Sequence, residues 1–323
     1  MEVMEPTMEV VEPEYLPEPP ERPRDPWYRR RSVHLALGLI VAILTALWAG
    51  QRAENGVRAN LDARLRDAGA GTDAALVTLE AEQLSALRAV AFTRGVGHAL
   101  ATRDIKTLNS LVTPVQTNSD VPMVDVTFPS GRVVLAVRSK GAPLPVASRA
   151  GMPALVAAVE NAHKRRGGRS TVLAIFRSGP TLATVGPILD NGKVAGLALA
   201  MTPLADALGR FSQQVGATLT AYDQNGKPLA TTAPYEPRAV DADTAHALYA
   251  GGATVIRYVR GPDREMLGRL VLDHQAVALL GVSLEDNSPV TGHAVFLYAA
   301  IGLLCVMIIV GSFSLRVASR WWQ

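Results

Sequence analysis

Residues 180–204, PTLATVGPILDNGKVAGLALAMTPL, predict an antiparallel hairpin followed by a helix. Two apolar runs flank Asp190-Asn191-Gly192. An Asn-Gly pair between apolar runs favours a type I′ turn, because both residues tolerate a positive φ. Pro203 and the periodic sequence after it then begin a helix.

The same pattern recurs along the chain. Residues 265–284, EMLGRLVLDHQAVALLGVSL, again read as strand, polar turn and strand. Residues 124–137 and 217–232 each predict a hairpin with a glycine-containing turn. A unit of hairpin, helix and hairpin therefore occurs twice. Antiparallel hairpins separated by helices predict the α+β class rather than a doubly wound parallel sheet.

Composition excludes several classes of function. The net charge is only +3, and no basic stripe interleaved with aromatic residues is present, so nucleic-acid binding is not expected. The single cysteine, Cys305, excludes an intramolecular disulfide and a cysteine-based metal cluster. Residues 1–31 begin with repeated Glu and Pro and almost no apolar residues, which is typical of a disordered, acidic, proline-rich tail.

Two uncharged apolar stretches predict membrane spans. Residues 32–50 would extend about 28 Å as a helix, close to the thickness of the hydrocarbon layer. A cleaved signal peptide is the competing interpretation, but the leader is long and the stretch lacks a convincing cleavage site, so we expect an uncleaved anchor. The second predicted span is 292–316, of which residues 294–315 are the uncharged apolar stretch. Arginines on the outer flanks of both spans place both termini, including residues 317–323, in the cytoplasm and residues 51–293 outside it.

The segment 51–115 shows helical periodicity. We expect a first helix that is interrupted at Gly69-Ala70-Gly71, a second over 73–101 and a third beginning near Asp104. The apolar seam of residues 73–101 is expected to pack on a sheet. For residues 51–68, sheet packing and a homodimer contact remain equal alternatives.

The two repeated units then follow. The first has predicted strands at 124–128, 132–138, 170–177, 181–189 and 193–201, with helices at 152–163 and 204–214. The second has predicted strands at 217–223, 227–232, 253–260, 265–272 and 276–284, with a helix at 242–250.

This arrangement resembles the double Cache domain, the extracytoplasmic sensor module of bacterial chemoreceptors, histidine kinases and nucleotide cyclases. The resemblance is carried by LEAEQLSALRAVAFTRGVGHALATRD (79–104) leading into VDVTFPSGRVVLAV, by VGPILDNGKVAGLALAMTPLADAL (185–208), and by the position between two spans. It implies two PAS-like antiparallel-sheet units after a long helix. The membrane-distal unit would cover 51–212 and the membrane-proximal unit 213–291.

The resemblance also implies a ligand site in the distal unit, between its sheet and the segment that covers it. Members that bind amino acids have an Asp at the end of the last distal strand, and this chain has Met201 there. Aromatic residues that those members place in the covering segment are missing between Gly151 and Arg169. These departures weigh against amino acids and amines as ligands of that site.

Alternation along a strand places Leu197, Leu199 and Met201 on one face. A two-residue turn at Asn191-Gly192 would continue this face through Thr184 and Leu182 to Phe176 and Ala174. A three-residue loop would continue it through Thr181 and Val185 to Arg177 and Ile175, because a one-residue slip exchanges the faces. An apolar small-molecule pocket and an ordinary core fit this face equally well.

Arg138, Arg169 and Arg177 are the cations best placed near this face, where a guanidinium would suit a carboxylate ligand; the alternative for each is a surface arginine at a strand end. The candidate ligand-binding residues are Arg138, Arg169, Phe176, Arg177, Thr181, Thr184 and Met201.

No enzymatic motif is present in the sequence. It has no HExxH pair, no GxSxG elbow and no phosphate loop with its lysine, so we expect no catalytic residue, no metal and no cofactor. We expect a bacterial inner-membrane sensor that binds a small molecule. Only residues 317–323 follow the second span, so either the signal passes to a separate partner or the sequence is a truncation of a longer receptor. The alternative is an accessory subunit of a membrane complex that uses the Cache pair as a docking surface.

Overall fold

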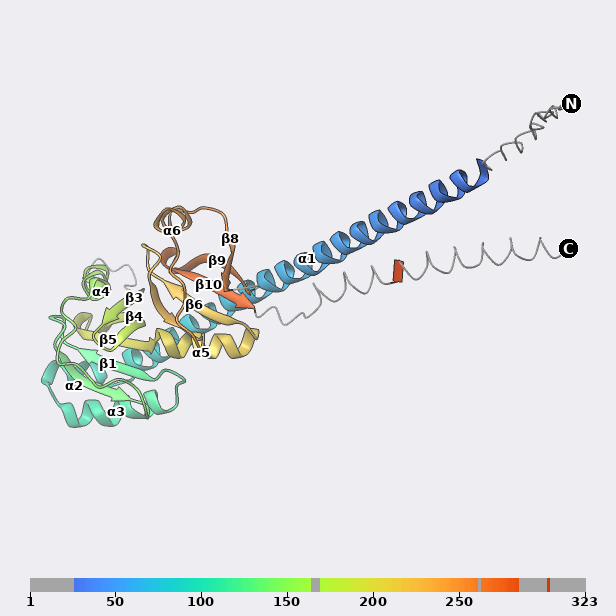
Figure 1. Cartoon of the computed structure of the whole chain (residues 1–323). Helices are drawn as coiled ribbons and strands as arrows, with labels where there is room; N and C mark the ends of the chain where they lie inside the picture. The colour runs from blue at the N-terminus through green and yellow to red at the C-terminus, as the bar shows by residue number, and fades with distance from the viewer. Residues whose placement is uncertain (1–25, 164–168, 261–262, 285–300, 303–323) are drawn as a thin grey trace, which may run out of the picture. The chain divides into compact units, whose positions relative to one another are not determined.

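The computed structural model describes residues 26–163, 169–260, 263–284 and 301–302. The chain divides into two compact units. One consists of residues 1–55 and 289–323, and the other of residues 56–288. The second unit contains both β-sheets and the helices packed on them (Figure 1).

A single helix, α1 (Pro26–Phe92), replaces the first two predicted helices. The interruption predicted at Gly69-Ala70-Gly71 was wrong, because these glycines serve close packing inside a continuous helix. A Cβ on Gly69 would lie 2.3 Å from Cε of Met266. A Cβ on Gly71 would lie 2.9 Å from Cγ1 of Val215. Small residues here let two other elements approach the helix axis.

Two shorter helices follow, α2 (Val96–Thr102) and α3 (Ile105–Thr117). The chain turns between α1 and α2 at Gly95, whose φ of 96° favours glycine. Asp104 begins α3 as predicted, and its Oδ1 accepts a hydrogen bond from the Thr107 backbone N–H at 3.1 Å.

Two five-stranded antiparallel sheets follow, and they have the same topology. The first has the order β2-β1-β5-β4-β3 and the second the order β7-β6-β10-β9-β8. The predicted α+β class with two antiparallel sheets after a long helix is confirmed. The strands of the first sheet are β1 (Met123–Thr127), β2 (Val133–Arg138), β3 (Ser170–Phe176), β4 (Gly179–Asp190) and β5 (Lys193–Pro203). Those of the second are β6 (Thr218–Tyr222), β7 (Pro228–Thr231), β8 (Val255–Arg260), β9 (Asp263–Leu272) and β10 (Gln275–Leu284).

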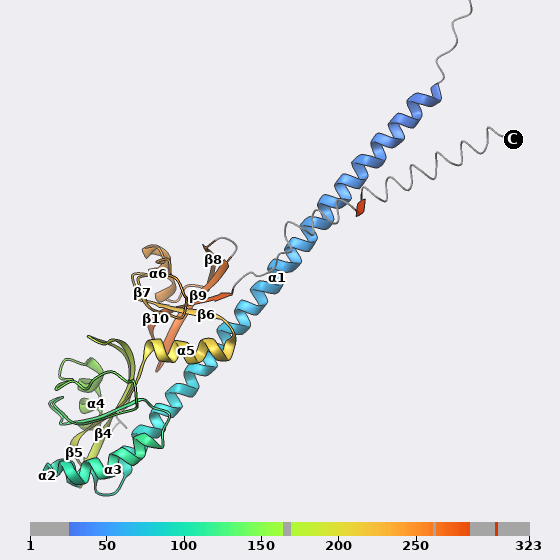
Figure 2. The ribbon, with the colours of Figure 1, turned by 60° about the horizontal axis from the view of Figure 1, so that its bottom comes forward.

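Three further helices accompany the sheets: α4 (Pro153–His163), α5 (Leu204–Val215) and α6 (Ala242–Tyr249). Within the second unit, α1 packs on one face of both sheets. Leu65 and Leu79 join α5 and the second sheet in one core, whereas Leu87 and Val90 join α2, α3 and the first sheet in another. Figure 2 shows α5 lying against α1. Buried residues of α4 and α6 pack on the opposite faces of the first and second sheet.

The two long hairpins share an irregularity that the sequence pattern did not show. In the first, Asn191 and Gly192 form the two-residue turn with φ of 48° and 75°. Ile188 then pairs with Gly196 and Leu189 with Val194, so Ala195 forms a β-bulge. In the second hairpin Asp273 and His274 form the turn, and Val277 forms a bulge at the same position after it.

Residues 32–50, predicted as the first span, are part of α1. Over the ranges that the structure describes, no helix is long and apolar enough to span a membrane. The predicted second span at 292–316 lies outside the described residues except for residues 301–302, as do residues 1–25 of the predicted tail.

Candidate functional site

The face of the first sheet under α4 is the one predicted to bind a ligand. Met201 pairs with Ala183, and Leu199 pairs with Val185. Ala183 pairs in turn with Val172. The face therefore runs from Leu197, Leu199 and Met201 through Val185, Ala183 and Thr181 to Val172, Ala174 and Phe176.

Neither predicted register was correct as a whole. The two-residue turn is present, but β5 has the bulge at Ala195 just after it. Beyond this bulge each β5 residue pairs with a β4 residue one position away from the predicted partner, so the two faces of β4 are exchanged. Thr181 and Val185 therefore share the face with Met201, while Leu182 and Thr184 point to the opposite face, toward α1.

A buried cluster of charges occupies the same face. Asp125, in the middle of β1, has a side chain with 0% exposure and pairs with two arginines. Arg138 at the end of β2 forms an ion pair with Oδ1 of Asp125, and Arg149 lies 2.9 Å from Oδ2. Two guanidinium groups thus share one carboxylate, which leaves an excess of positive charge among these three side chains.

The two arginines are held differently. Arg138 also donates to the carbonyl oxygens of Val124, Val137 and Pro143 at 3.2, 2.9 and 3.3 Å. Arg149 lies in the segment before α4, with its Cζ 4.2 Å from the ring centroid of Phe176. Its side chain is only 4% exposed. Arg149 therefore connects the segment before α4, which covers the sheet, to β1 through the ion pair with Asp125 and to β3 through the cation–π contact with Phe176.

The structure separates the seven predicted site residues. Phe176, Thr181 and Met201 share the face with the charge cluster, and Arg138 belongs to that cluster. Arg177 is exposed between β3 and β4. Thr184 lies on the other face of the sheet, and Arg169 borders a cavity on that side.

Asp125 and Arg149 were missed by the sequence prediction. Asp125 left a signal, because a carboxylate inside the apolar run MVDVT is unexpected in a buried strand. Arg149 left none, since it stands in an irregular segment whose path the pattern does not predict.

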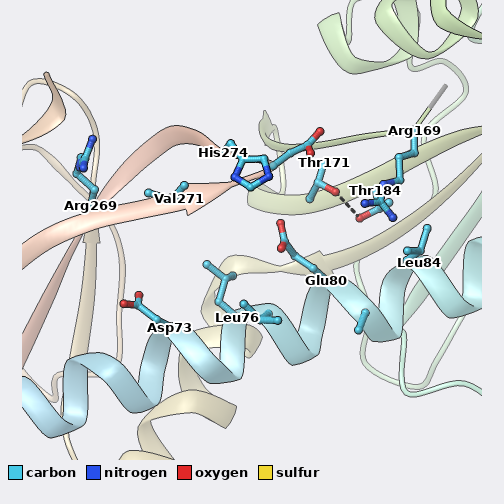
Figure 3. Close-up of a pocket in the computed structure, with 13 residues that line it drawn as sticks. Asp73, Leu76, Glu80, Leu84, Arg169, Thr171, Thr184, Arg269, Val271 and His274 are labelled. Carbon is cyan, nitrogen blue, oxygen red and sulfur yellow. Dashed lines mark hydrogen bonds between the residues drawn. The ribbon is translucent and has the colours of Figure 1, made fainter. Parts of the chain in front are cut away.

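The opposite face of the first sheet borders a cavity of about 510 Å³ (Figure 3). Three elements of the second compact unit line it: α1, the β3–β4 edge of the first sheet, and the β9–β10 hairpin of the second. The lining residues are Asp73, Leu76, Val77, Glu80, Ala81, Leu84, Arg169, Thr171, Thr184, Arg269, Val271, Asp273 and His274.

Polar side chains connect this cavity to the interface of α1 and the first sheet. The hydroxyls of Thr171 and Thr184 lie 3.2 Å apart. Thr184 donates to Oε1 of Gln83 at 2.8 Å, and Nε2 of Gln83 donates to the Leu182 carbonyl and to the Thr202 hydroxyl. Gln83 is buried, and these bonds satisfy its amide.

Two carboxyl groups of α1 that line the cavity have raised pKa values. Burial raises the pKa of Glu80 above its ordinary value, an effect opposed by the Asp273 backbone amide and by the charges of Arg169 and His274. Burial also raises the pKa of Asp73. Figure 3 shows the Glu80 carboxylate pointing from α1 toward His274 and Thr171.

The second sheet buries a carboxylate of its own on the face under α6. Glu265 accepts a hydrogen bond from the Tyr222 hydroxyl at 2.7 Å and from Nε of Arg257 at 2.7 Å. Arg257 also donates to the carbonyl oxygens of Ala239 and Arg238. The positive charge of Arg257 therefore balances the negative charge of Glu265, and each carboxylate oxygen of Glu265 has a hydrogen-bond donor.

No group of three or more His, Cys, Asp or Glu side chains within the described ranges is arranged to hold a metal ion.

The sequence matches no protein-family model and no curated protein. Several solved structures are similar to this chain in fold. The sensor domain of the Vibrio cholerae histidine kinase DctB has 10% identity and a TM-score of 0.47, and the match covers 72% of this chain and 98% of that one. The ligand-binding domain of the Campylobacter jejuni chemoreceptor Tlp3, in complex with L-valine, has 12% identity and a TM-score of 0.46, covering 73% and 94%. The periplasmic domain of Vibrio cholerae LuxQ has 12% identity and a TM-score of 0.42, covering 68% and 99%.

The first two of these neighbours are a sensor domain of a histidine kinase and a ligand-binding domain of a chemoreceptor. The three TM-scores lie below 0.5.

Proposed function

We propose that this protein is a bacterial extracytoplasmic sensor, anchored in the cytoplasmic membrane, that binds a small carboxylate ligand on the face of the first sheet under α4. The observation that carries the proposal is the pairing of two guanidinium groups, the partly buried one of Arg138 and the buried one of Arg149, with the single buried carboxylate of Asp125. Removing charges from water is costly, and an unbalanced buried cation is best stabilised by an anion.

Arg149 is the arginine that a ligand would engage. Arg138 is fixed by three backbone carbonyls as well as by Asp125, whereas Arg149 comes from the segment that covers the sheet. A ligand carboxylate that binds Arg149 in place of Asp125 would change how the cover is tied to the sheet. A ligand with such a preference for one arrangement shifts the protein toward it.

The apolar stretches at 32–50 and 292–316 support the proposed anchors, and signalling would pass through the second of them to a separate protein partner. In this proposal both termini are cytoplasmic, and residues 51–293 face outward.

Thermal unfolding of the protein in the presence of small carboxylates, nucleobases, sugars and amines tests the proposal. A ligand that binds only the folded state adds about 2.7 kcal/mol of stability at a hundredfold excess over its dissociation constant. We expect a concentration-dependent rise in the unfolding midpoint with a carboxylate. The rise should disappear in Arg149→Met and persist in Arg177→Met, which removes an exposed guanidinium from the same sheet.

Circular dichroism of both variants establishes that they are folded. A carboxylate response that Arg149→Met retains would refute the proposed site. Absence of any response, together with stable co-purification of a larger membrane assembly, would instead favour the docking function.

A further inference from the structure

The cavity between α1 and the two sheets has a chemistry different from that of the charge cluster under α4. It lies on the opposite face of the first sheet, and its lining includes three carboxylates, of Asp73, Glu80 and Asp273. The cavity volume of about 510 Å³ is in the range of small-molecule sites. We propose that it is a second ligand site, which takes a small organic diamine through the carboxylates of Glu80 and Asp73.

Glu80 determines the sign of the charge that the ligand carries. Its Oε1 atom is buried and has no hydrogen-bond partner among the described residues. A buried acceptor without a donor is costly, and the cost is larger for a charged group. An ammonium group can donate to this oxygen and neutralise its charge, whereas an anionic ligand can do neither.

Asp73 and the apolar floor determine the shape of the ligand. Asp73 and Glu80 lie about two turns apart on α1, so both point from one face of the helix into the cavity, separated by about 10 Å along the axis. Leu76 and Val77 stand between them, and Leu76 is almost fully buried. A polymethylene chain with an amine at each end matches this sequence of acid, apolar surface and acid.

The cavity also contains basic side chains, and their position matters for the ligand. Arg169, Arg269 and His274 come from the sheet edges opposite α1, and all three are exposed. Water screens such charges. The two guanidinium groups are on long, flexible side chains that can turn outward, whereas the Oε1 atom of Glu80 is buried and has no donor among the described residues. Asp73 is exposed as well, so the Glu80 carboxylate, with its buried Oε1 atom, is the group that a bound ligand must satisfy first.

Occupation of this cavity would have a structural consequence. Its walls belong to α1, to the β3–β4 edge and to the β9–β10 hairpin, so one ligand would contact elements of both sheets and the helix that they share. Such a ligand would stabilise the arrangement of the two sheets that closes around it.

The test compares three molecules with the same spacer of methylenes: 1,5-diaminopentane, 1,5-pentanediol and heptanedioate. Calorimetric titration and thermal unfolding of the full chain in detergent should show saturable binding of the diamine and a rise in the unfolding midpoint. The diol and heptanedioate should have no effect, because neither carries a positive charge. Glu80→Gln should weaken diamine binding by about tenfold or more, because a charge-assisted hydrogen bond is lost. Asp67→Asn, which removes an exposed carboxylate on the same helix outside the cavity lining, should leave binding unchanged.

Two further readouts separate this proposal from the function proposed above. Arg149→Met should retain diamine binding even where it abolishes a carboxylate response, so that each site can fail alone. Glu80→Gln should also raise the unfolding midpoint of the ligand-free protein, because it removes a charge that burial disfavours. The proposal is overturned by the absence of saturable diamine binding up to about 10 mM, by equal binding of the diol, or by undiminished diamine binding in Glu80→Gln.

Discussion

At the scale of single residues, the chain stabilises a buried carboxylate by surrounding it with donors. Glu265 is 1% exposed and receives hydrogen bonds from Tyr222 and Arg257. Gly281 on the neighbouring strand provides the space, since a Cβ there would lie 2.1 Å from Oε1 of Glu265. The Tyr222 hydroxyl therefore has to remain protonated for the network to persist.

This requirement makes alkaline stability depend on Tyr222. Burial, followed by the charge of Glu265, raises the pKa of Tyr222 above its ordinary value. In the unfolded chain a tyrosine ionises near pH 10. Because the folded pKa is the higher one, the contribution of Tyr222 to the free energy of unfolding is complete below about pH 10 and is lost as the pH rises above it. Urea unfolding should show a smaller loss between about pH 9 and pH 11 in Tyr222→Phe than in the unaltered protein.

Tyr258→Phe serves as the control, because Tyr258 is 57% exposed. It should leave the alkaline loss unchanged. Equal losses in the unaltered protein and in Tyr222→Phe would contradict the assignment.

At the scale of elements, close contacts between strands and helices depend on particular glycines. Gly196 of β5 faces the carbonyl oxygen of Thr127, which a Cβ would approach to 2.2 Å. The obstructing atom belongs to the backbone of a neighbouring strand and cannot turn aside. We expect Gly196→Ala to lower the free energy of unfolding by about 1–3 kcal/mol, as overpacking does.

Gly209 in α5 offers the matched control, because a Cβ there meets nothing within 4 Å. Gly209→Ala should be neutral or stabilise by up to about 1 kcal/mol, since alanine favours a helix. Denaturant unfolding of both variants measures the difference. Equal effects would show that the contact at Gly196 is relieved by movement of the strands.

Much of the element order could be predicted from the sequence, because strand alternation and the Asn191-Gly192 turn are local patterns. The bulge at Ala195 could not, because it arises from how the two strands pair, and it exchanged the faces assigned to Thr181 and Thr184. Gly69 and Gly71 suggested a break in the helix, whereas the structure uses them for contact with Met266 and Val215.

The candidate site was predicted less well than the fold. The sequence assigned Phe176 and Thr181 to alternative registers, whereas the structure has both on the face of Met201 and Arg138. The charge cluster there is completed by Asp125 and by Arg149 from an irregular segment. The cavity joins α1 to two hairpins that are far apart in the sequence. Local sequence patterns describe only neighbouring residues, so they could not predict that these three elements lie close together.

At the scale of the whole molecule, α1 is common to two hydrophobic cores of the second compact unit, those on the sheet faces opposite α4 and α6. Leu79 belongs to the core with the second sheet, and Leu87 belongs to the core with the first. A disturbance of this helix should therefore reach both sheets together.

Thr78→Pro tests this coupling, because proline removes the helical hydrogen bond of residue 78 and costs about 3 kcal/mol or more inside a helix. Thr78 is exposed, so the substitution deletes no core side chain. Amide hydrogen exchange should show reduced protection in β4–β5 and in β9–β10 alike. Ser110→Pro in α3, which belongs to the core of the first sheet and, among the described residues, not to that of the second, should affect β4–β5 more strongly. Loss confined to one sheet in Thr78→Pro would contradict the coupling.

The shared bulge position has a consequence for how substitutions in this chain can be interpreted. Because Ala195 and Val277 occupy the same place after equivalent turns, the two long hairpins align at one constant offset, which matches Ala183 of β4 with Glu265 of β9. The protein thus contains an internal comparison: two copies of one scaffold, of which one presents a methyl group and the other a carboxylate at the corresponding point. The effects of the two side chains on the local stability of their sheets can therefore be compared within one molecule, in the same solvent and under the same conditions.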